Sequence, residues 1–183
     1  MKIATVGKGR IGGGLGRLWE QAGHEVTAIG RGGGDVSDAD AVLISVPGPA
    51  VDEALVAVTG LRGKTVIDAT NLAGTEPPDG FASNAEFIKS QTHGPTAKAF
   101  NTNFAVLFDR VASARVRPSN LWCGDDDARA VVEQLSRDAG YDPVYTGGLE
   151  NAAVQEDFLK LVMAISRGGT GPFFYRIAAA DDF

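Results

Sequence analysis

Three glycines near the start of the chain are spaced so that they can hold a phosphate, in the pattern Gly7-Lys8-Gly9-Arg10-Ile11-Gly12. The first glycine allows a tight turn, the second lets a pyrophosphate approach the backbone, and the third lets a helix pack closely on a strand. An apolar segment at residues 3–6 precedes the pattern, and apolar residues at helical spacing follow it up to position 22. Strand, glycine turn and helix together predict a dinucleotide site, because the helix N-terminus offers free N–H groups and partial positive charge to the phosphates.

A second site feature follows the next predicted strand, at residues 25–29, which ends in Gly30 and Arg31. An enzyme that uses NAD places Asp or Glu at the end of this strand, where the carboxylate binds the 2′-hydroxyl of the ribose. A small neutral residue followed by a guanidinium suits a 2′-phosphate instead, because Arg can bind it through two parallel hydrogen bonds. The sequence therefore favours NADP(H) over NAD. Asp35 lies four residues beyond Arg31, and we interpret it as a solvated loop residue.

Polar residues also follow two later strands, predicted at residues 65–68 and 97–100. The first strand leads into Asp68-Ala69-Thr70-Asn71, and the second leads into Asn101-Thr102-Asn103. In open α/β sheets the carboxyl ends of the strands face the ligand crevice, so these residues are candidates for the same site. Asn101 also has a purely structural interpretation, as a cap of the helix predicted at residues 104–112.

Side chains for hydrolytic or metal chemistry are few. The two histidines are His24, in a turn, and His93, just before a strand, where it has a minor chance of reaching the site. No Ser-His-Asp pattern, Cys-His pair or metal-ligand spacing is present, so we predict no metal. Cys123 is predicted to be a buried, inert thiol. The run Asp125-Asp126-Asp127 is better explained by acids at a helix start than by metal binding.

The order of strands and helices predicts an α/β fold with a Rossmann-type, mostly parallel sheet and helices on both faces. Residues 32–40 are too few for the usual crossover of at least about 10–12 residues, so the third strand and its helix should be shortened or missing. The strand at 25–29 should then lie at the edge of the sheet. A capping box, Ser83 with Glu86, opens a helix that extends to about Gln91.

A long helix at 149–166 and an aromatic tail at 168–176 form a short helical C-terminal extension. We therefore divide the chain into an NADP-binding Rossmann domain at 1–147 and a C-terminal helix and tail at 148–183. This extension packs on the same domain or on a partner subunit, or its aromatic residues line the substrate side.

Composition narrows the class of protein. With 183 residues and 44% hydrophobic content the chain can form a globular core, and its net charge of −6 argues against general nucleic-acid binding. A single cysteine excludes an intrachain disulfide and fits a reducing compartment. No apolar run approaches the roughly 20 residues that span a bilayer, and no signal peptide is evident. We expect a soluble, cytoplasmic protein with no membrane partner.

The chain resembles the coenzyme F420-dependent NADP oxidoreductases and the related dinucleotide-binding domain of the STEAP metalloreductases. The resemblance covers most of the chain, and its most specific parts are the segments Phe100-Asn101-Thr102 and Cys123-Gly124-Asp125-Asp126-Asp127. The glycine turn, Gly30-Arg31, Ala39-Asp40-Ala41 leading to Ser45-Val46-Pro47, and Lys98-Ala99 match as well, and the tail from Gly169 to Phe174 matches more loosely.

The resemblance implies an enzyme, usually dimeric, that binds NADP across the strand ends and passes a hydride between nicotinamide and a flavin-like ring. By carry-over, Lys8–Ile11 would hold the pyrophosphate, Arg31 the 2′-phosphate, and Ser45–Pro47 would line the path from adenosine to ribose. Asn101 and Asn103 would lie near the nicotinamide and the second ring, which makes them weak catalytic candidates. The expected cofactor-binding residues are Gly7, Lys8, Gly9, Arg10, Ile11, Gly12, Arg31, Ser45, Val46, Pro47, Thr70, Asn71, Asn101 and Thr102.

Our first hypothesis is an NADPH-dependent oxidoreductase whose small-molecule electron acceptor is a flavin or deazaflavin, such as FMN, FAD or F420, and which forms a homodimer. Such chemistry is carried by the cofactors, and the protein mainly positions them. A reductase of a small substrate and a non-catalytic NADP-binding sensor are the alternatives. Gly13 and Gly14, which directly follow the glycine turn, cost about 1 kcal/mol each relative to Ala in a helix. They either admit a second ring or let the helix pack tightly.

Overall fold

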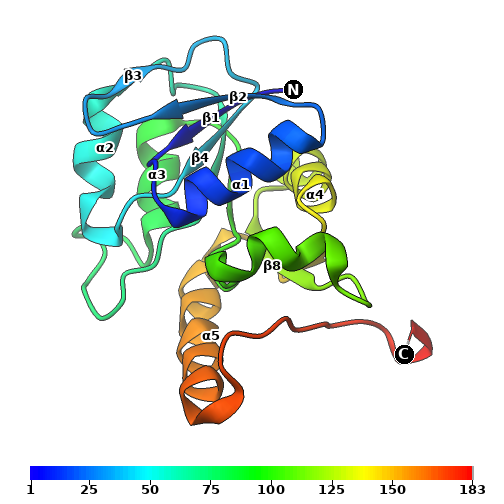
Figure 1. Cartoon of the computed structure of the whole chain (residues 1–183). Helices are drawn as coiled ribbons and strands as arrows, with labels where there is room; N and C mark the ends of the chain where they lie inside the picture. The colour runs from blue at the N-terminus through cyan, green and yellow to red at the C-terminus, as the bar shows by residue number, and fades with distance from the viewer. Residues whose placement is uncertain (183) are drawn as a thin grey trace.

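The structure is a computed structural model and describes residues 1–182 (Figure 1). Its centre is a seven-stranded sheet in the order β2-β1-β4-β6-β7-β8-β9, in which every neighbouring pair is parallel except β7 and β8. This is the predicted mostly parallel α/β fold. The strands are β1 (Lys2–Val6), β2 (Glu25–Ile29), β4 (Ala41–Ile44), β6 (Thr65–Asp68), β7 (Thr96–Ala99), β8 (Ser119–Gly124) and β9 (Asp142–Tyr145).

Helices cover both faces of the sheet because the central strands are apolar on both sides. Alternate residues of β1 and β4 belong to different cores: Ile3 and Leu43 pack with the helices of one face, and Ala4 and Val42 with those of the other. The first face is covered by α1 (Arg10–Gln21), the 3₁₀ helix η2 (Ala105–Ser113) and α4 (Arg129–Asp138), and the second by α2 (Val51–Ala57) and α3 (Asn84–Thr92).

The predicted loss of the third strand and its helix is confirmed at the edge of the sheet. Strand β2 pairs only with β1 in the seven-stranded sheet, and no further strand among residues 1–182 lies beyond it. The short segment after β2 instead forms β3 (Gly34–Asp35), which pairs with β5 (Val58–Thr59) in a separate two-stranded sheet that the sequence did not predict.

Asp35 is a correction to our reading of this segment. It is exposed, as expected, but its Oδ1 accepts hydrogen bonds from the hydroxyls of Ser37 at 2.6 Å and Thr59 at 3.2 Å, so it fastens the small sheet. These hydrogen bonds, the one from Ser37 first, lower the pKa of its carboxyl group. A contact between residues 24 positions apart carries no local sequence signal.

The capping box at α3 is confirmed, because Ser83 Oγ accepts a hydrogen bond from the Glu86 backbone N–H at 3.2 Å. The Glu86 carboxylate in turn accepts a hydrogen bond from the N–H of Ala82, one residue before the cap. The segment expected as an α-helix at 104–112 is helical, but it is the 3₁₀ helix η2.

The C-terminal part begins with the 3₁₀ turn η4 (Leu149–Asn151) and continues through α5 (Ala152–Ile165) and a π-helical turn, η5 (Ser166–Thr170). Figure 1 shows α5 pointing away from the sheet and the tail running back past η2. The aromatic tail contacts the body: Phe173 packs on Phe104 with ring centroids 5.6 Å apart, and the Tyr175 hydroxyl lies 2.6 Å from Thr102 Oγ1. Across residues 1–182, no helix has the length and apolarity to cross a membrane.

Candidate functional site

The predicted site residues lie along one edge of the sheet. Strands β2, β1, β4, β6 and β7 are neighbours and parallel, so the segments that follow them come together at their carboxyl ends. These segments contain Arg31, the glycine turn, Ser45–Pro47, Thr70–Asn71 and Asn101–Asn103. In open α/β sheets this edge forms the ligand crevice.

The glycine turn has the geometry that the pattern predicts. Gly7 has a φ of +110°, and a Cβ on Gly12 would lie 2.1 Å from the Gly7 carbonyl oxygen, so both positions require glycine. Gly9 has no heavy atom within 4 Å of the place where its Cβ would be, so its backbone faces open space. Helix α1 begins at the next residue without a side-chain cap and without an acid in its first turn, so its first N–H groups are free for an anion.

Ser45 contacts the glycine turn from the neighbouring strand. Its Oγ donates toward the carbonyl oxygens of Val6 at 3.1 Å and Gly7 at 3.2 Å, so the hydroxyl braces the glycine turn from the neighbouring strand. A Cβ on Gly12 would also lie 2.4 Å from this hydroxyl. The side chain of Ser45 thus helps to hold the shape of the turn, and Val46 and Pro47 beside it are half-buried and exposed, respectively.

Three cations surround the turn. The side chains of Lys8, Arg10 and Arg31 are exposed, and none of them forms an ion pair with a carboxylate of the described residues. In a chain of net charge −6, unpaired cations gathered at one edge create a local positive potential. The arrangement suits a ligand with several phosphate charges.

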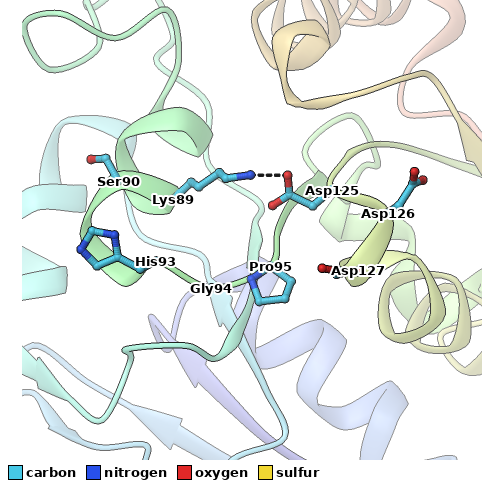
Figure 2. A pocket seen from close by; sticks show the side chains of 8 residues that line it. All are labelled: Lys89, Ser90, His93, Gly94, Pro95, Asp125, Asp126 and Asp127. Carbon is cyan, nitrogen blue, oxygen red and sulfur yellow. Dashed lines mark hydrogen bonds and ion pairs between the residues drawn. The ribbon is translucent and has the colours of Figure 1, made fainter.

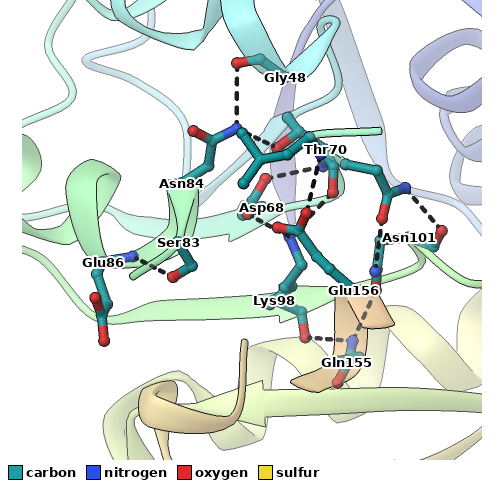
Figure 3. A network of polar contacts seen from close by, with 12 residues as sticks. Gly48, Asp68, Thr70, Ser83, Asn84, Glu86, Lys98, Asn101, Gln155 and Glu156 are labelled. Atoms are coloured by element: carbon teal, nitrogen blue, oxygen red, sulfur yellow. Dashed lines mark hydrogen bonds and ion pairs between the residues drawn. The ribbon is translucent and has the colours of Figure 1, made fainter. Parts of the chain in front are cut away.

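A buried ionic cluster lies beneath the ends of β6 and β7 (Figure 3). The ammonium of Lys98 lies 2.8 Å from Asp68 Oδ2, 2.8 Å from Glu156 Oε1 of α5, and 3.0 Å from the carbonyl oxygen of Thr70. Burial alone would lower the pKa of Lys98, but the two carboxylates outweigh it and raise the pKa, so the side chain is charged. The other oxygen of Glu156 accepts the N–H of Leu72 at 2.9 Å, so the cluster holds the segment that follows β6.

Asn101 belongs to an amide network beside this cluster. Its Nδ2 donates to Asn71 Oδ1 at 3.0 Å, Asn71 Nδ2 donates to the Asn101 carbonyl at 2.9 Å, and Gln155 Nε2 of α5 donates to Asn101 Oδ1 at 2.7 Å. Asn101 does not cap the following helix, whose N-cap is Phe104. Its amide nitrogen and oxygen each have a partner within the protein, so Asn71 and Gln155 hold this side chain in a defined orientation.

Asn103 is held in a comparable way, because its Nδ2 donates to the carbonyl oxygen of Ser119 at 3.0 Å.

The turn that carries Asn101 and Asn103 begins at Phe100, a buried non-glycine residue with a φ of +62°. Such a conformation costs about 1–3 kcal/mol and persists only where its surroundings impose it. Here Asn120 Oδ1 accepts the Phe100 N–H at 2.9 Å, and the ring packs edge-on against Trp19 with centroids 5.8 Å apart.

Sequence reasoning assigned no role to Glu156 or Gln155, and it named Lys98 only as part of a strand and of the family resemblance. One signal was available: a lysine among small apolar residues in a predicted buried strand, Ala97-Lys98-Ala99, has to find a carboxylate. Its partners on α5 lie more than fifty positions away, and nothing local in the sequence identifies them.

A pocket lies at the opposite edge of the sheet, beside the amino end of β7 (Figure 2). This pocket has a volume of about 680 Å³ and is lined by Lys89, Ser90, His93, Gly94, Pro95, Asp125, Asp126 and Asp127. Its carboxylates are largely occupied, because Asp125 pairs with Lys89 and accepts the Thr96 N–H at 2.9 Å, and Asp126 pairs with Arg129. The site at the carboxyl edge is therefore the better candidate.

This pocket also bears on two predictions. His93 ends α3 there, at the edge far from the candidate site, so its minor chance of reaching that site is lost. The three aspartates lie at a helix start, as predicted, with Asp125 at the N-cap position of the 3₁₀ turn η3 (Asp126–Ala128). Asp125 makes no side-chain capping hydrogen bond there, because its carboxylate joins α3 and β7 instead. Residues 1–182 contain no cluster of three or more His, Cys, Asp or Glu side chains that could hold a metal ion.

Neither a protein-family model nor a curated protein sequence matches this chain. Among solved structures, a candidate F420-dependent NADP reductase from Arthrobacter sp. FB24 aligns with a TM-score of 0.81 and 24% identity, over 97% of this chain and 99% of its own. A hypothetical protein from Sinorhizobium meliloti aligns with a TM-score of 0.61 and 22% identity, over 84% and 88% of the two chains. A reductive aminase from Aspergillus terreus, solved with NADPH and ethyl levulinate, aligns with a TM-score of 0.66 and 17% identity, and this chain spans 62% of its length. The chain therefore has the Rossmann-type fold of these proteins.

Proposed function

We propose that this protein is an NADP(H)-dependent oxidoreductase that transfers a hydride between the nicotinamide and a flavin or deazaflavin acceptor. The observation that carries the proposal is the carboxyl edge itself, where an open glycine turn and an uncapped helix start meet three cations without carboxylate partners. Backbone N–H groups at a helix N-terminus bind pyrophosphate, and the guanidinium of Arg31 suits a 2′-phosphate.

The residues at this edge fit such a cofactor. Space beside Gly9 admits a phosphate to the backbone, and the first turn of α1 supplies N–H donors. The segments after β4, β6 and β7 would line the path toward the nicotinamide, with Thr70, Asn71 and Asn101 held in place by the buried network. When bound, NADPH supplies the hydride, and these residues orient the ring and exclude water around it.

The acceptor class rests on the comparisons and on the resemblance. The candidate F420-dependent NADP reductase matches this chain along nearly its whole length, whereas this chain spans 62% of the reductive aminase. The likeness to proteins solved with NADPH also supports the choice of cofactor. F420, FMN and FAD are therefore the acceptors to test first.

The binding part of the proposal is tested with NADPH and NADH on the wild type and on Arg31→Ala. The wild type should bind NADPH more tightly than NADH. The variant should lose about 10- to 100-fold in NADPH affinity and little in NADH affinity, since a hydrogen bond to a charged group contributes about 1.5–3 kcal/mol. Isothermal titration calorimetry measures both constants. An unchanged NADPH preference in Arg31→Ala would refute the assignment of the 2′-phosphate.

Turnover is then followed by the loss of NADPH absorbance with FMN, FAD and F420 in parallel. Oxidation that depends on both the protein and one of these acceptors supports the proposal. If NADPH binds tightly and none of the three is reduced, the acceptor part of the proposal is wrong, and the sensor or small-substrate alternatives replace it.

A further inference from the structure

Lys8 belongs to the glycine turn, but its side chain lies against the end of the neighbouring strand β2. If Gly30 had a Cβ, this atom would lie 3.4 Å from Cε of Lys8, 3.6 Å from its Cδ and 3.8 Å from its Nζ. The aliphatic stem of Lys8 therefore covers Gly30 and brings the ammonium beside the residue that precedes Arg31. Any side chain larger than a methyl group at position 30 would compete for the space in which Lys8 lies.

The register of the sheet places the two residues at neighbouring strand ends. Strands β1 and β2 are parallel, with Val6 opposite Ile29, and the Gly7 N–H donates to the Ile29 carbonyl at 2.9 Å. Lys8 and Arg31 each follow two residues after this pair, so they leave neighbouring strands at the same level. The end of the second strand is the place where Rossmann folds recognise the ribose of adenosine.

No carboxylate of the described residues pairs with either cation, although both are exposed and the protein as a whole is acidic. Two cations at neighbouring strand ends repel each other, and an anion with about two negative charges bound between them offsets that repulsion. A phosphate monoester has this charge and accepts hydrogen bonds through three oxygens. The guanidinium provides a planar pair of donors and the ammonium a compact charge with adaptable donors, so the two groups complement each other.

We propose that Lys8 and Arg31 together bind the 2′-phosphate of NADP(H), which makes Lys8 a specificity-determining residue and not the pyrophosphate contact expected from the resemblance. This inference rests on the proposed function, since it names a second residue of the same cofactor site. It assigns separate tasks to the two cations of the turn: Lys8 recognises the 2′-phosphate, and Arg10, the first residue of α1, remains beside the pyrophosphate.

The test uses Lys8→Met, which keeps the aliphatic stem and removes the charge, and Arg10→Met as the matched control from the same turn. The ligands are adenosine 2′,5′-bisphosphate, which has a 2′-phosphate and no pyrophosphate, and ADP, which has a pyrophosphate and no 2′-phosphate. NADPH and NADH are measured alongside. Thermal unfolding of each variant should match the wild type, because neither cation has a protein partner to lose.

Lys8→Met should weaken the bisphosphate and NADPH about 10-fold or more and leave ADP and NADH within about twofold. Arg10→Met should weaken ADP, NADH and NADPH alike. Lys8→Met together with Arg31→Ala should abolish the preference for NADPH, while each single variant retains part of it.

The inference is overturned if Lys8→Met weakens ADP as much as the bisphosphate, which would return Lys8 to the pyrophosphate, or if it changes no affinity at all. Failure of the proposed function gives a different result: the wild type itself then shows no preference for NADPH over NADH, or binds neither.

Discussion

Cys123 shows how burial determines the chemistry of a single residue. It lies on β8 opposite Lys98 and is fully buried. Burial raises the pKa of its thiol from 9.0 to about 11, and the positive charge of Lys98 only partly opposes this shift. The thiolate is the reactive form of cysteine, and it is scarce at neutral pH here. The inert role predicted from the sequence agrees with this environment.

The pKa of Cys123 predicts a pH dependence of stability. The folded state keeps the thiol protonated, whereas the unfolded chain loses this proton above about pH 9. The contribution is fully present below pH 9 and is lost as the pH rises through about 11, with a total on the order of 2 kcal/mol. Urea unfolding of the wild type and of Cys123→Ala between about pH 8 and pH 11 measures it. The wild type should lose more unfolding free energy than the variant over this range, and parallel curves would contradict the assignment.

At the scale of elements, glycine has two different roles in the turn and α1: some glycines permit close packing, and others leave space for a ligand. Gly12 permits close packing, because its missing side chain leaves room for the Gly7 carbonyl and for Ser45. Gly9 has an ordinary extended backbone, with φ −77° and ψ −166°, and open space beside it. Gly14 belongs to the first kind, since a Cβ there would lie 2.4 Å from the Phe108 ring of η2. For Gly14, tight helix packing is therefore the explanation of the extra glycine.

Alanine substitutions distinguish these demands. Gly12→Ala should destabilise the protein by about 1–3 kcal/mol, because the new methyl group meets backbone that cannot move aside. Gly9→Ala should unfold like the wild type and lose affinity for ADP, because the methyl group fills the phosphate approach. Gly13→Ala is the matched control: its nearest contact would be 3.8 Å, so the variant should gain up to about 1 kcal/mol. Chemical denaturation and ADP titration check each variant, and a stable Gly12→Ala that binds ADP normally would contradict the packing argument.

At the scale of the whole molecule, the ionic cluster joins the C-terminal helix to the sheet. Glu156 pairs with Lys98 and accepts the Leu72 N–H, and Gln155 donates to the carbonyl oxygen of Leu121 at 3.1 Å and to Asn101. Through these contacts α5 determines the position of the segments that follow β6 and β7. The site therefore depends on a helix from outside the predicted Rossmann domain of residues 1–147.

Lys98→Met should cost about 3–5 kcal/mol of unfolding free energy, because it leaves the carboxylates of Asp68 and Glu156 buried without a cation. Amide hydrogens of α5 should exchange faster in this variant. Lys160→Met is the control on the same helix: its ion pair with Asp157 is exposed, so its effect should stay below about 1 kcal/mol. Urea denaturation and hydrogen exchange measure both variants. A loss of less than about 1 kcal/mol in Lys98→Met would show that the cluster does not hold α5.

Much of the architecture could be predicted from local patterns. The glycine turn, the polar strand ends and the apolar spacing of α1 each lie within about 20 consecutive residues, where the periodicity of side chains determines the element. Residues 32–40, which follow β2, are too few to form the usual third strand with its helix, so their number alone predicted that this unit is shortened or missing. Parallel strands share one carboxyl edge, so these local signals also placed Arg31, Thr70 and Asn101 together. The homodimer, the cytoplasmic location and the acceptor stay predictions.

Tertiary structure alone decided which side chains contact each other across that edge. It brought Asn101 into hydrogen bonds with Asn71 and Gln155, and Asp35 into one with Thr59. It also placed Lys8 beside the end of β2. It also separated His93 from the site. The physical reason is that a buried charge or amide requires a partner but does not specify one. Any carboxylate or carbonyl within hydrogen-bonding distance can be that partner. Which one lies there depends on how distant helices and strands pack against each other, and local sequence does not determine this.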